Sequence, residues 1–388
     1  MMSPPNSKRL RIVQVLPSLI SGGVERGTLD LCAYLIQQGH QAYVISSGGP
    51  LVSELETMGA KHILLPVHSK NPFIIYRNSQ KLSKIIQDYK FDLIHVRSRA
   101  PAWSCLSASR QTKTPLVSTF HGQYGHQNKL KRLYNSGMLR TDTCIAVSQF
   151  IENHLKENYP QYAVPIKLIR RGIDLSYFSQ TYTADQIERL KDQWHIDQEH
   201  RVVLLPGRIT RIKGHLTLLK ALTQLRSERI TCLIVGDAAG KLAYHQSLLD
   251  FIEANQLSEQ VKFTGNCNDM AALYALADIV ISASSKPEAF GRTACEAQAM
   301  GCLVVATRHG GSLETIAPAQ QPFMCDVDSS ESMAKAIKLA LSLCQKDKLE
   351  QKQAIIQASK AHITQNFSLE RMCLETISLY NELTAITE

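Results

Sequence analysis

Short apolar runs alternate with amphipathic stretches along the whole chain of 388 residues. The first apolar run, 10–16, is followed by a glycine-containing loop and then by a helical pattern over 27–38 that ends at Gly39. Further buried strands are predicted at 42–46, 62–65, 93–96, 116–120 and 144–147. Because helical segments separate these strands, the pattern indicates a parallel, doubly wound α/β sheet.

The pattern breaks over 171–193, which is polar and has no strong period, and then restarts. A second set of strands is predicted at 202–205, 231–235, 261–264, 279–282 and 303–306. A chain of this length is too long for one ordinary core. We therefore predict an N-terminal domain over 1–178, a C-terminal domain over 179–368, and a last segment, 369–388, whose helix crosses back to the first domain.

The composition indicates the class of protein but does not identify what the protein binds. Hydrophobic residues make up 44% of the chain and charged residues 20%, which is the balance of a globular enzyme. No apolar run is long enough to span a bilayer, and the ten cysteines form no C-x-x-C pair, which favours reduced thiols in a cytoplasmic protein. The net charge of +9 suits nucleic acid, an anionic membrane or phosphorylated small molecules. No zinc-finger or ribonucleoprotein motif supports nucleic acid as a partner.

The first candidate site is the loop Ser21-Gly22-Gly23 between the first strand and the first helix. Glycines let the backbone approach a ligand closely, and the following helix directs its N–H groups and positive dipole toward an anion. A tight strand-to-helix turn is the alternative. The incomplete G-x-G-x-x-G spacing argues against a nicotinamide or flavin cofactor.

The second candidate is the basic segment 206–214, directly after the first strand of the second domain. Ligands of doubly wound sheets gather at the carboxyl ends of the strands, where this segment lies. Arg208 presents a planar fork to phosphate oxygens, and Lys213 presents a mobile point charge. A solvated basic loop is the alternative interpretation.

The third candidate is the pair Glu288 and Glu296, eight residues apart. Pro287 and Gly291 indicate a loop that turns into a helix at 291–293, so that Glu288 precedes the helix and Glu296 lies one turn inside it. The two carboxylates can then bind hydroxyl groups while the N–H groups between them bind phosphate. A nucleotide sugar presents sugar hydroxyls, diphosphate and ribose hydroxyls in this order. One helix-terminal acid and one surface Glu would be the plainer explanation.

Together these segments resemble glycosyltransferase family 4, the retaining transferases of the GT-B fold, over nearly the whole chain. The resemblance is carried by Gly22-Gly23-Val24-Glu25-Arg26, Arg171-Gly172-Ile173-Asp174, the Gly-Arg…Lys-Gly residues of 207–214, and the Glu-x7-Glu residues of 288–296 with Phe290-Gly291. It implies two Rossmann-like domains that face each other across a cleft. It also implies a nucleotide-diphosphate sugar as donor, with uridine diphosphate the commonest carrier, and a reaction that needs neither metal nor cofactor.

The resemblance also implies roles for single residues. Arg208 and Lys213 hold the donor diphosphate, which Gly22 and Gly23 approach from the facing domain. Glu288 contacts the donor sugar, Phe290 and Gly291 belong to the same motif, and Glu296 contacts the ribose. His121, at the end of the strand 116–120, positions the sugar or stabilises charge at the reaction centre. Without this context His121 would be a polar cap of a strand.

Two segments, 98–103 and 170–174, are similar to envelope transferases that build lipopolysaccharide or surface polysaccharide. They imply a cell-envelope glycan or glycolipid as acceptor. Arg97, Arg99 and Arg171 are candidates to bind an acceptor phosphate or carboxylate, with solvated rim charges as the alternative. Arg171 replaces the Asn that is usual before Gly-Ile-Asp, so the role of that Asn is not transferred.

Two further features bear on partners. The basic and apolar residues of 128–140 could rest on the inner face of an anionic membrane, although a charged outer helix face is the preferred interpretation. Asp326-Val327-Asp328 resembles the metal-binding Asp-x-Asp of the other transferase fold, but Asp328 with Glu331 fits a helix N-cap.

The rival functions are a nucleotide-sugar epimerase or another GT-B enzyme, and a non-catalytic basic binding module.

Overall fold

The computed structural model describes residues 8–20, 22–125, 128–238 and 240–385, so Ser21 of the predicted glycine loop lies outside the described residues. The chain divides into two compact units. Unit 1 comprises Met1–Arg171 with Leu369–Glu388, and unit 2 comprises Gly172–Ser368. The division falls after Arg171, whereas the sequence predicted a boundary at residue 178. The C-terminal segment 369–388 groups with unit 1.

Unit 1 is built on a seven-stranded parallel sheet with the order β3-β2-β1-β4-β5-β6-β7. Its strands are β1 (Arg11–Val15), β2 (Gln41–Ser46), β3 (Lys61–Leu64), β4 (Leu93–Val96), β5 (Leu116–Phe120), β6 (Thr143–Ala146) and β7 (Ile166–Leu168). The strands predicted at 93–96 and 116–120 have the predicted bounds. The sequence missed β7, because it has only three residues and none of them is buried.

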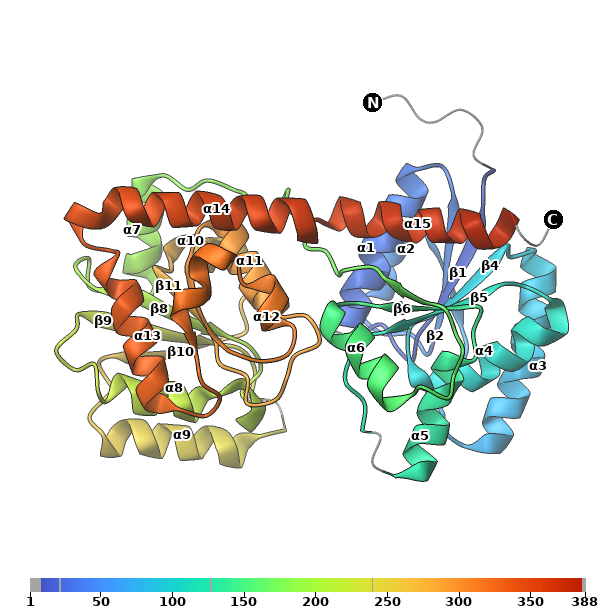
Figure 1. Cartoon of the computed structure of the whole chain (residues 1–388), viewed down its shortest axis with the longest axis horizontal. Coiled ribbons are helices and arrows are strands. Elements are labelled where there is room, and N and C mark those ends of the chain that lie inside the picture. The colour runs from blue at the N-terminus through green and yellow to red at the C-terminus, as the bar shows by residue number, and fades with distance from the viewer. Residues whose placement is uncertain (1–7, 21, 126–127, 239, 386–388) are drawn as a thin grey trace. The chain divides into compact units, whose positions relative to one another are not determined.

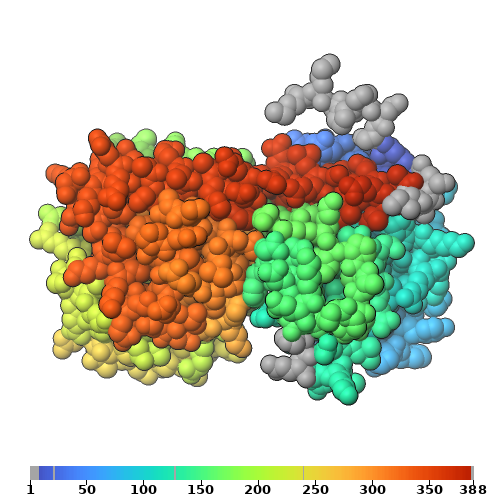
Figure 2. Space-filling view, viewed as in Figure 1, coloured from blue at the N-terminus to red at the C-terminus, as the bar shows by residue number. Residues whose placement is uncertain are grey.

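Helices cover both faces of this sheet (Figure 1). They are α1 (Gly23–Gln37), α2 (Val52–Thr57), α3 (Pro72–Tyr89), α4 (Arg99–Thr112), α5 (Lys129–Asn135), α6 (Gln149–Asn158) and α15 (Leu369–Ala385), with the 3-10 helix η1 at Ser136–Leu139. The helix α15, red in Figure 2, packs its Cys373 and Tyr380 into the core that α1 and β1 form. The Tyr380 hydroxyl lies 2.5 Å from Nδ1 of His95 on β4, which ties the C-terminal helix to the sheet.

Unit 2 has a six-stranded parallel sheet with the order β10-β9-β8-β11-β12-β13. Its strands are β8 (Arg201–Pro206), β9 (Ile230–Val235), β10 (Val261–Gly265), β11 (Ile279–Ser282), β12 (Leu303–Thr307) and β13 (Met324–Cys325). Along β8, Val203 and Leu205 enter one apolar core, while Val202 and Leu204 enter another. Both faces are therefore buried, which explains why these strands read as continuous apolar runs.

The helices of unit 2 surround this sheet. They are α7 (Ala184–Gln193), α8 (His215–Leu222), α9 (Leu242–Ala254), α10 (Met270–Leu276), α11 (Arg292–Met300), α12 (Ser312–Thr315), α13 (Ser330–Ser342) and α14 (Leu349–Phe367), with the 3-10 helices η2 (Arg211–Lys213), η3 (Pro318–Phe323) and η4 (Lys346–Lys348). No residue of α7 is fully buried, but Ile187 and Leu190 on one face of the helix pack against the apolar core of unit 2, a period that the sequence analysis missed. The predicted cap of α13 is wrong: Ser329, not Asp328, accepts the hydrogen bond from the backbone N–H of Ser332.

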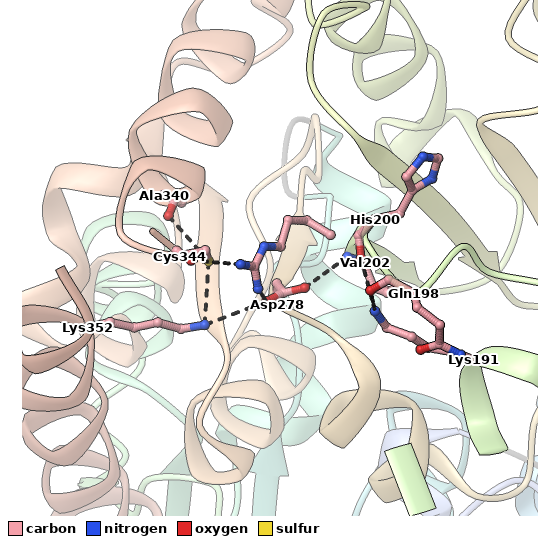
Figure 3. Close-up of polar contacts among 9 residues, drawn as sticks. Lys191, Gln198, His200, Val202, Asp278, Ala340, Cys344 and Lys352 are labelled. Atoms are coloured by element: carbon pink, nitrogen blue, oxygen red, sulfur yellow. Dashed lines mark hydrogen bonds and ion pairs between the residues drawn. The ribbon is translucent and has the colours of Figure 1, made fainter. Parts of the chain in front are cut away.

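Charged side chains contact one another at the amino-end edge of the unit 2 sheet (Figure 3). The carboxylate of Asp278, just before β11, accepts a 3.0 Å hydrogen bond from the backbone N–H of Val202. It also pairs with Arg201 at 3.2 Å and with Lys352 of α14 at 3.6 Å. These contacts fix the starts of β8 and β11, and the opposite, carboxyl-end edge carries the loops predicted to bind a ligand. No helix among the described residues combines the length and apolar character that a membrane span requires.

Candidate functional site

The loop after β8 holds the basic segment of unit 2 at the carboxyl-end edge of the sheet. The chain leaves β8 at Gly207, turns through η2, and enters α8 at Gly214 with φ at 72°. A Cβ on Gly214 would lie 2.1 Å from the carbonyl oxygen of Ala283, so only glycine allows this approach to the end of β11. Arg208 on this loop is exposed.

Lys213 and Glu288 form an ion pair at this edge of the sheet. Nζ of Lys213 lies 2.5 Å from Oε1 of Glu288, and the Ser284 hydroxyl donates to the same oxygen at 2.5 Å. Burial raises the pKa of Glu288, but the charge and hydrogen bond of Lys213 and the hydrogen bond of Ser284 lower it more. The pKa of Glu288 therefore falls below its ordinary value of 4.5, and the carboxylate is charged at neutral pH.

The helix α11 begins at the predicted place. Gly291, at the N-cap with φ at 92°, has no side chain to cap the helix. Phe290 is buried and packs on Phe367 with 5.6 Å between ring centroids, which fixes the chain just before the turn. Glu288 thus precedes the positive end of α11, with Lys213 beside it.

Glu296 lies one turn inside α11 and is 7% exposed. It accepts a 2.9 Å hydrogen bond from the hydroxyl of Tyr274 and pairs with Nε of Arg292 at 2.5 Å. The sequence predicted neither partner, and it also missed Ser284. Since Ser284 follows β11 closely, the rule that ligands gather at carboxyl ends of strands is a signal that points to it.

In unit 1 the predicted residues gather at the corresponding edge of the sheet. Arg97 follows β4 and His121 follows β5, and both line one pocket together with Arg171. Arg97 is 5% exposed and donates from Nη1 to Oε1 of Gln14 at 2.8 Å. Among the described residues, Nε of Arg97 and both ring nitrogens of His121 are buried without a hydrogen-bond partner. Burial, Arg97 and Arg171 lower the pKa of His121 well below 6.5, so its ring is neutral at pH 7.

The predicted glycine loop lies beside the same pocket. Gly22 is the N-cap of α1 with φ at 137°, and the guanidinium of Arg171 donates a hydrogen bond to the carbonyl oxygen of Gly23. A Cβ on Gly23 would lie 2.8 Å from Nη1 of Arg171. The absence of a side chain at Gly23 therefore lets the guanidinium lie against the start of α1.

Arg99 is separate from this group. Its guanidinium carbon lies 3.9 Å from the ring centroid of Tyr124, and its Nη1 donates to Oδ1 of Asn135 at 3.1 Å. It begins α4 and does not line the pocket that holds Arg97. Of the three predicted acceptor-side arginines, the structure brings together Arg97 and Arg171.

Comparison with known proteins decides the family. Residues 21–177 match the model of Glycosyltransferase Family 4, and residues 186–362 match that of Glycosyl transferases group 1. The crystal structure of a glycosyltransferase from Rickettsia africae is 38% identical, with a TM-score of 0.89, and the match covers 97% of this chain and 99% of that chain. The chain belongs to glycosyltransferase family 4. The resemblance seen in the sequence motifs is thereby confirmed, and the protein is a glycosyltransferase.

Two further proteins are similar to this glycosyltransferase. The structure of Anabaena HepE in complex with UDP has a TM-score of 0.83 at 23% identity, covers 96% of this chain and 100% of that chain, and supports the predicted GT-B fold. The lipopolysaccharide 1,2-N-acetylglucosaminetransferase of Salmonella typhimurium is 30% identical over 226 residues, which are 56% of this chain and 57% of the relative.

Proposed function

We propose that this glycosyltransferase retains anomeric configuration and moves a sugar from a nucleoside-diphosphate donor, with uridine diphosphate as first choice, to a cell-envelope glycan or lipid-linked acceptor. The observation that carries the proposal is the pairing of Lys213 with Glu288 beside the start of α11, with Glu296 one turn further on. The HepE structure with UDP supports the choice of donor. The Salmonella lipopolysaccharide transferase supports the choice of acceptor.

In this proposal unit 2 binds the donor. Arg208 and Lys213 bind the diphosphate with the N–H groups near Gly291, and Phe290 shapes the turn. Glu288 accepts hydrogen bonds from the sugar hydroxyls, and Glu296 accepts them from the ribose. Because Lys213 and Glu288 pair at 2.5 Å, these two side chains hold each other in place before the donor binds.

The chemistry needs stabilisation of a leaving diphosphate whose negative charge grows as the glycosidic bond breaks. Arg208, Lys213 and the helix start supply this without a metal ion. Each charge-assisted hydrogen bond contributes roughly 1.5–3 kcal/mol net, a part of the ~8–23 kcal/mol by which enzymes lower barriers. Retention follows if the acceptor attacks the face that the diphosphate leaves, while a departing phosphate oxygen takes the acceptor's proton. His121 positions the sugar or stabilises charge at the reaction centre.

Unit 1 is the acceptor side in this proposal, and α5 is its candidate membrane contact. Leu130 is 75% exposed and Leu133 50% exposed, among the basic side chains of Lys129, Lys131 and Arg132. Apolar and basic residues together favour an anionic bilayer. Co-sedimentation with vesicles of an anionic phospholipid tests this contact, and an L130S/L133S variant that sediments equally well would contradict it.

A thermal-shift panel of nucleoside diphosphates and their sugars tests the donor, because a ligand that binds only the folded state raises Tm. We expect UDP and a UDP-sugar to give the largest shifts. An epimerase would convert its sugar nucleotide with no acceptor present, which product analysis detects. A basic binding module would bind polyanions with strong salt dependence and would not bind sugar nucleotides.

A further inference from the structure

The pocket at the carboxyl-end edge of unit 1 holds a buried cation that no carboxylate neutralises. Arg97 is 5% exposed, and within the described ranges it forms no salt bridge. Burial lowers the pKa of Arg97, and the one carboxylate that acts on it, Asp30, has the weakest of the opposing effects. A buried guanidinium that lacks an opposite charge is destabilised by the loss of its hydration. A ligand with negative charge would remove this cost.

A second guanidinium reaches the same place. Nη2 of Arg97 and Nη2 of Arg171 each lie 3.3 Å from the point that a Cβ on Gly27 would occupy, so the two atoms are at most twice that distance apart. Gly27 follows Gly23 by one turn of α1, and both glycines leave this helix face open. The positive end of the α1 dipole lies here as well. Three positive contributions therefore converge on one pocket.

The pocket also offers the Nε–H of Arg97 as a donor with no acceptor among the described residues, and the neutral ring of His121 can donate from one of its two nitrogens. Nε of Arg97 and both ring nitrogens of His121 are buried without partners in the part of the chain that the structure describes. The enclosed space is small, about 20 Å³, so it admits one small polar group rather than a whole glycan. A guanidinium binds phosphate or carboxylate oxygens through a planar fork of N–H groups.

We propose that Arg97 and Arg171, beside His121, form a subsite for an anionic group, a phosphate or a carboxylate, that the acceptor carries. This inference rests on the proposed function, in which unit 1 binds the acceptor. Arg171 stands where the wider family usually has a neutral Asn, so the second charge distinguishes this chain. The acceptor is thus an anionic molecule, and its charge is bound in unit 1 rather than by Arg208 and Lys213 of unit 2.

Isothermal titration of inorganic phosphate into the full-length protein tests the subsite. The protein is first saturated with UDP, which fills the phosphate site proposed for unit 2, and ionic strength is held constant with sodium chloride. We expect Arg171→Asn and Arg97→Gln to weaken phosphate binding at least tenfold. Arg110→Asn, which removes an equal charge from an exposed position of α4, serves as the matched control and should bind phosphate as the wild type does.

Circular dichroism and thermal unfolding check the fold of each variant. If Arg97→Gln fails to fold, Arg171→Asn decides alone, because it installs the residue usual in the family. A parallel titration with acetate separates a carboxylate subsite from a phosphate subsite by relative affinity. Equal phosphate affinity in the wild type and the Arg171→Asn variant would overturn the proposal.

The same titrations show whether the subsite assignment or the proposed function is wrong. If Arg171→Asn weakens UDP binding instead, the pocket serves the donor, and the acceptor assignment is wrong. If the wild type does not bind UDP at all, the choice of UDP as carrier fails, and the nucleoside diphosphate that gives the largest thermal shift replaces it. The phosphate titrations repeated without UDP then still decide whether the pocket of unit 1 binds an anion.

Discussion

The carboxyl-end edges of the two sheets differ in whether their cationic side chains are paired with carboxylates. In unit 2, Lys213 pairs with Glu288 and Arg292 pairs with Glu296, each at 2.5 Å. In unit 1, Arg97 is buried with an amide as its hydrogen-bond partner and no ion pair within the described ranges. These two cations of the first edge are paired with carboxylates, whereas Arg97 of the second edge is not.

This difference predicts which ligands each edge selects. A phosphate that approaches Lys213 competes with Glu288, so it gains most when it brings hydroxyl groups that satisfy the carboxylate as well. A nucleotide sugar does so, and inorganic phosphate does not. No carboxylate competes for Arg97, so a simple oxyanion is sufficient there. Unit 2 is therefore expected to prefer a whole donor, and unit 1 a single anionic group.

The largest effect is expected from Lys213→Ala, which removes a diphosphate ligand from the edge of unit 2. We expect kcat/KM to fall by about 10² or more, a cost of roughly 2.7 kcal/mol. The pair of Lys213 and Glu288 is partly exposed, so the free energy of unfolding should change by about 1 kcal/mol or less. Steady-state kinetics and urea denaturation measure the two, with Lys220→Ala on the exposed face of α8 as control. An unchanged rate in a folded variant would remove Lys213 from the site.

A smaller effect is expected from Glu296→Gln, which keeps a partner for Tyr274 but removes the charge. We expect UDP to bind about tenfold more weakly, which corresponds to the loss of one charge-assisted hydrogen bond of ~1.5 kcal/mol. The Glu296→Ala variant should bind UDP at least as weakly. Calorimetry with UDP measures both, and Glu253→Gln at an exposed position of α9 is the control. Equal UDP affinity in all variants would exclude Glu296 from the ribose contact.

The pairing in unit 2 also makes a prediction about pH. The pKa of Glu288 lies below 4.5, so its favourable contribution to stability is present above that pH and is lost as pH falls through the folded-state value. In Lys213→Met the effect of burial, which raises the pKa, remains while the lowering effect of Lys213 is gone. We expect the pKa of Glu288 to be higher in this variant than in the wild type, as a carbon-13 NMR titration of the carboxyl group would show. An unchanged pKa of Glu288 would contradict the pairing.

The sequence predicted the two sheets because most of their strands are buried on both faces and read as apolar runs. It missed β13 because two residues make no pattern. It placed Glu288 and Glu296 correctly about the start of α11, since Pro287 and Gly291 mark the turn. It did not predict that Lys213 contacts Glu288, because that pairing of residues distant in sequence depends on how the loops after β8 and β11 pack. Arg97 and Arg99 are two residues apart, and only the structure separates them.

The smallest expected effect concerns Gly27, which keeps the face of α1 open beside the two guanidiniums of unit 1. Alanine at this helical position should raise the free energy of unfolding by about 0.5–1 kcal/mol, because glycine is a poorer helix former. The added methyl would lie 3.3 Å from Nη2 of both Arg97 and Arg171, so these two guanidinium groups must shift by a few tenths of an ångström. We therefore expect Gly27→Ala to be more stable to urea and to bind phosphate several-fold more weakly. The reverse change at Ala33 of the same helix should lower stability and leave phosphate binding unaltered. If Gly27→Ala bound phosphate as tightly as the wild type, the two guanidiniums would not act together on the anion.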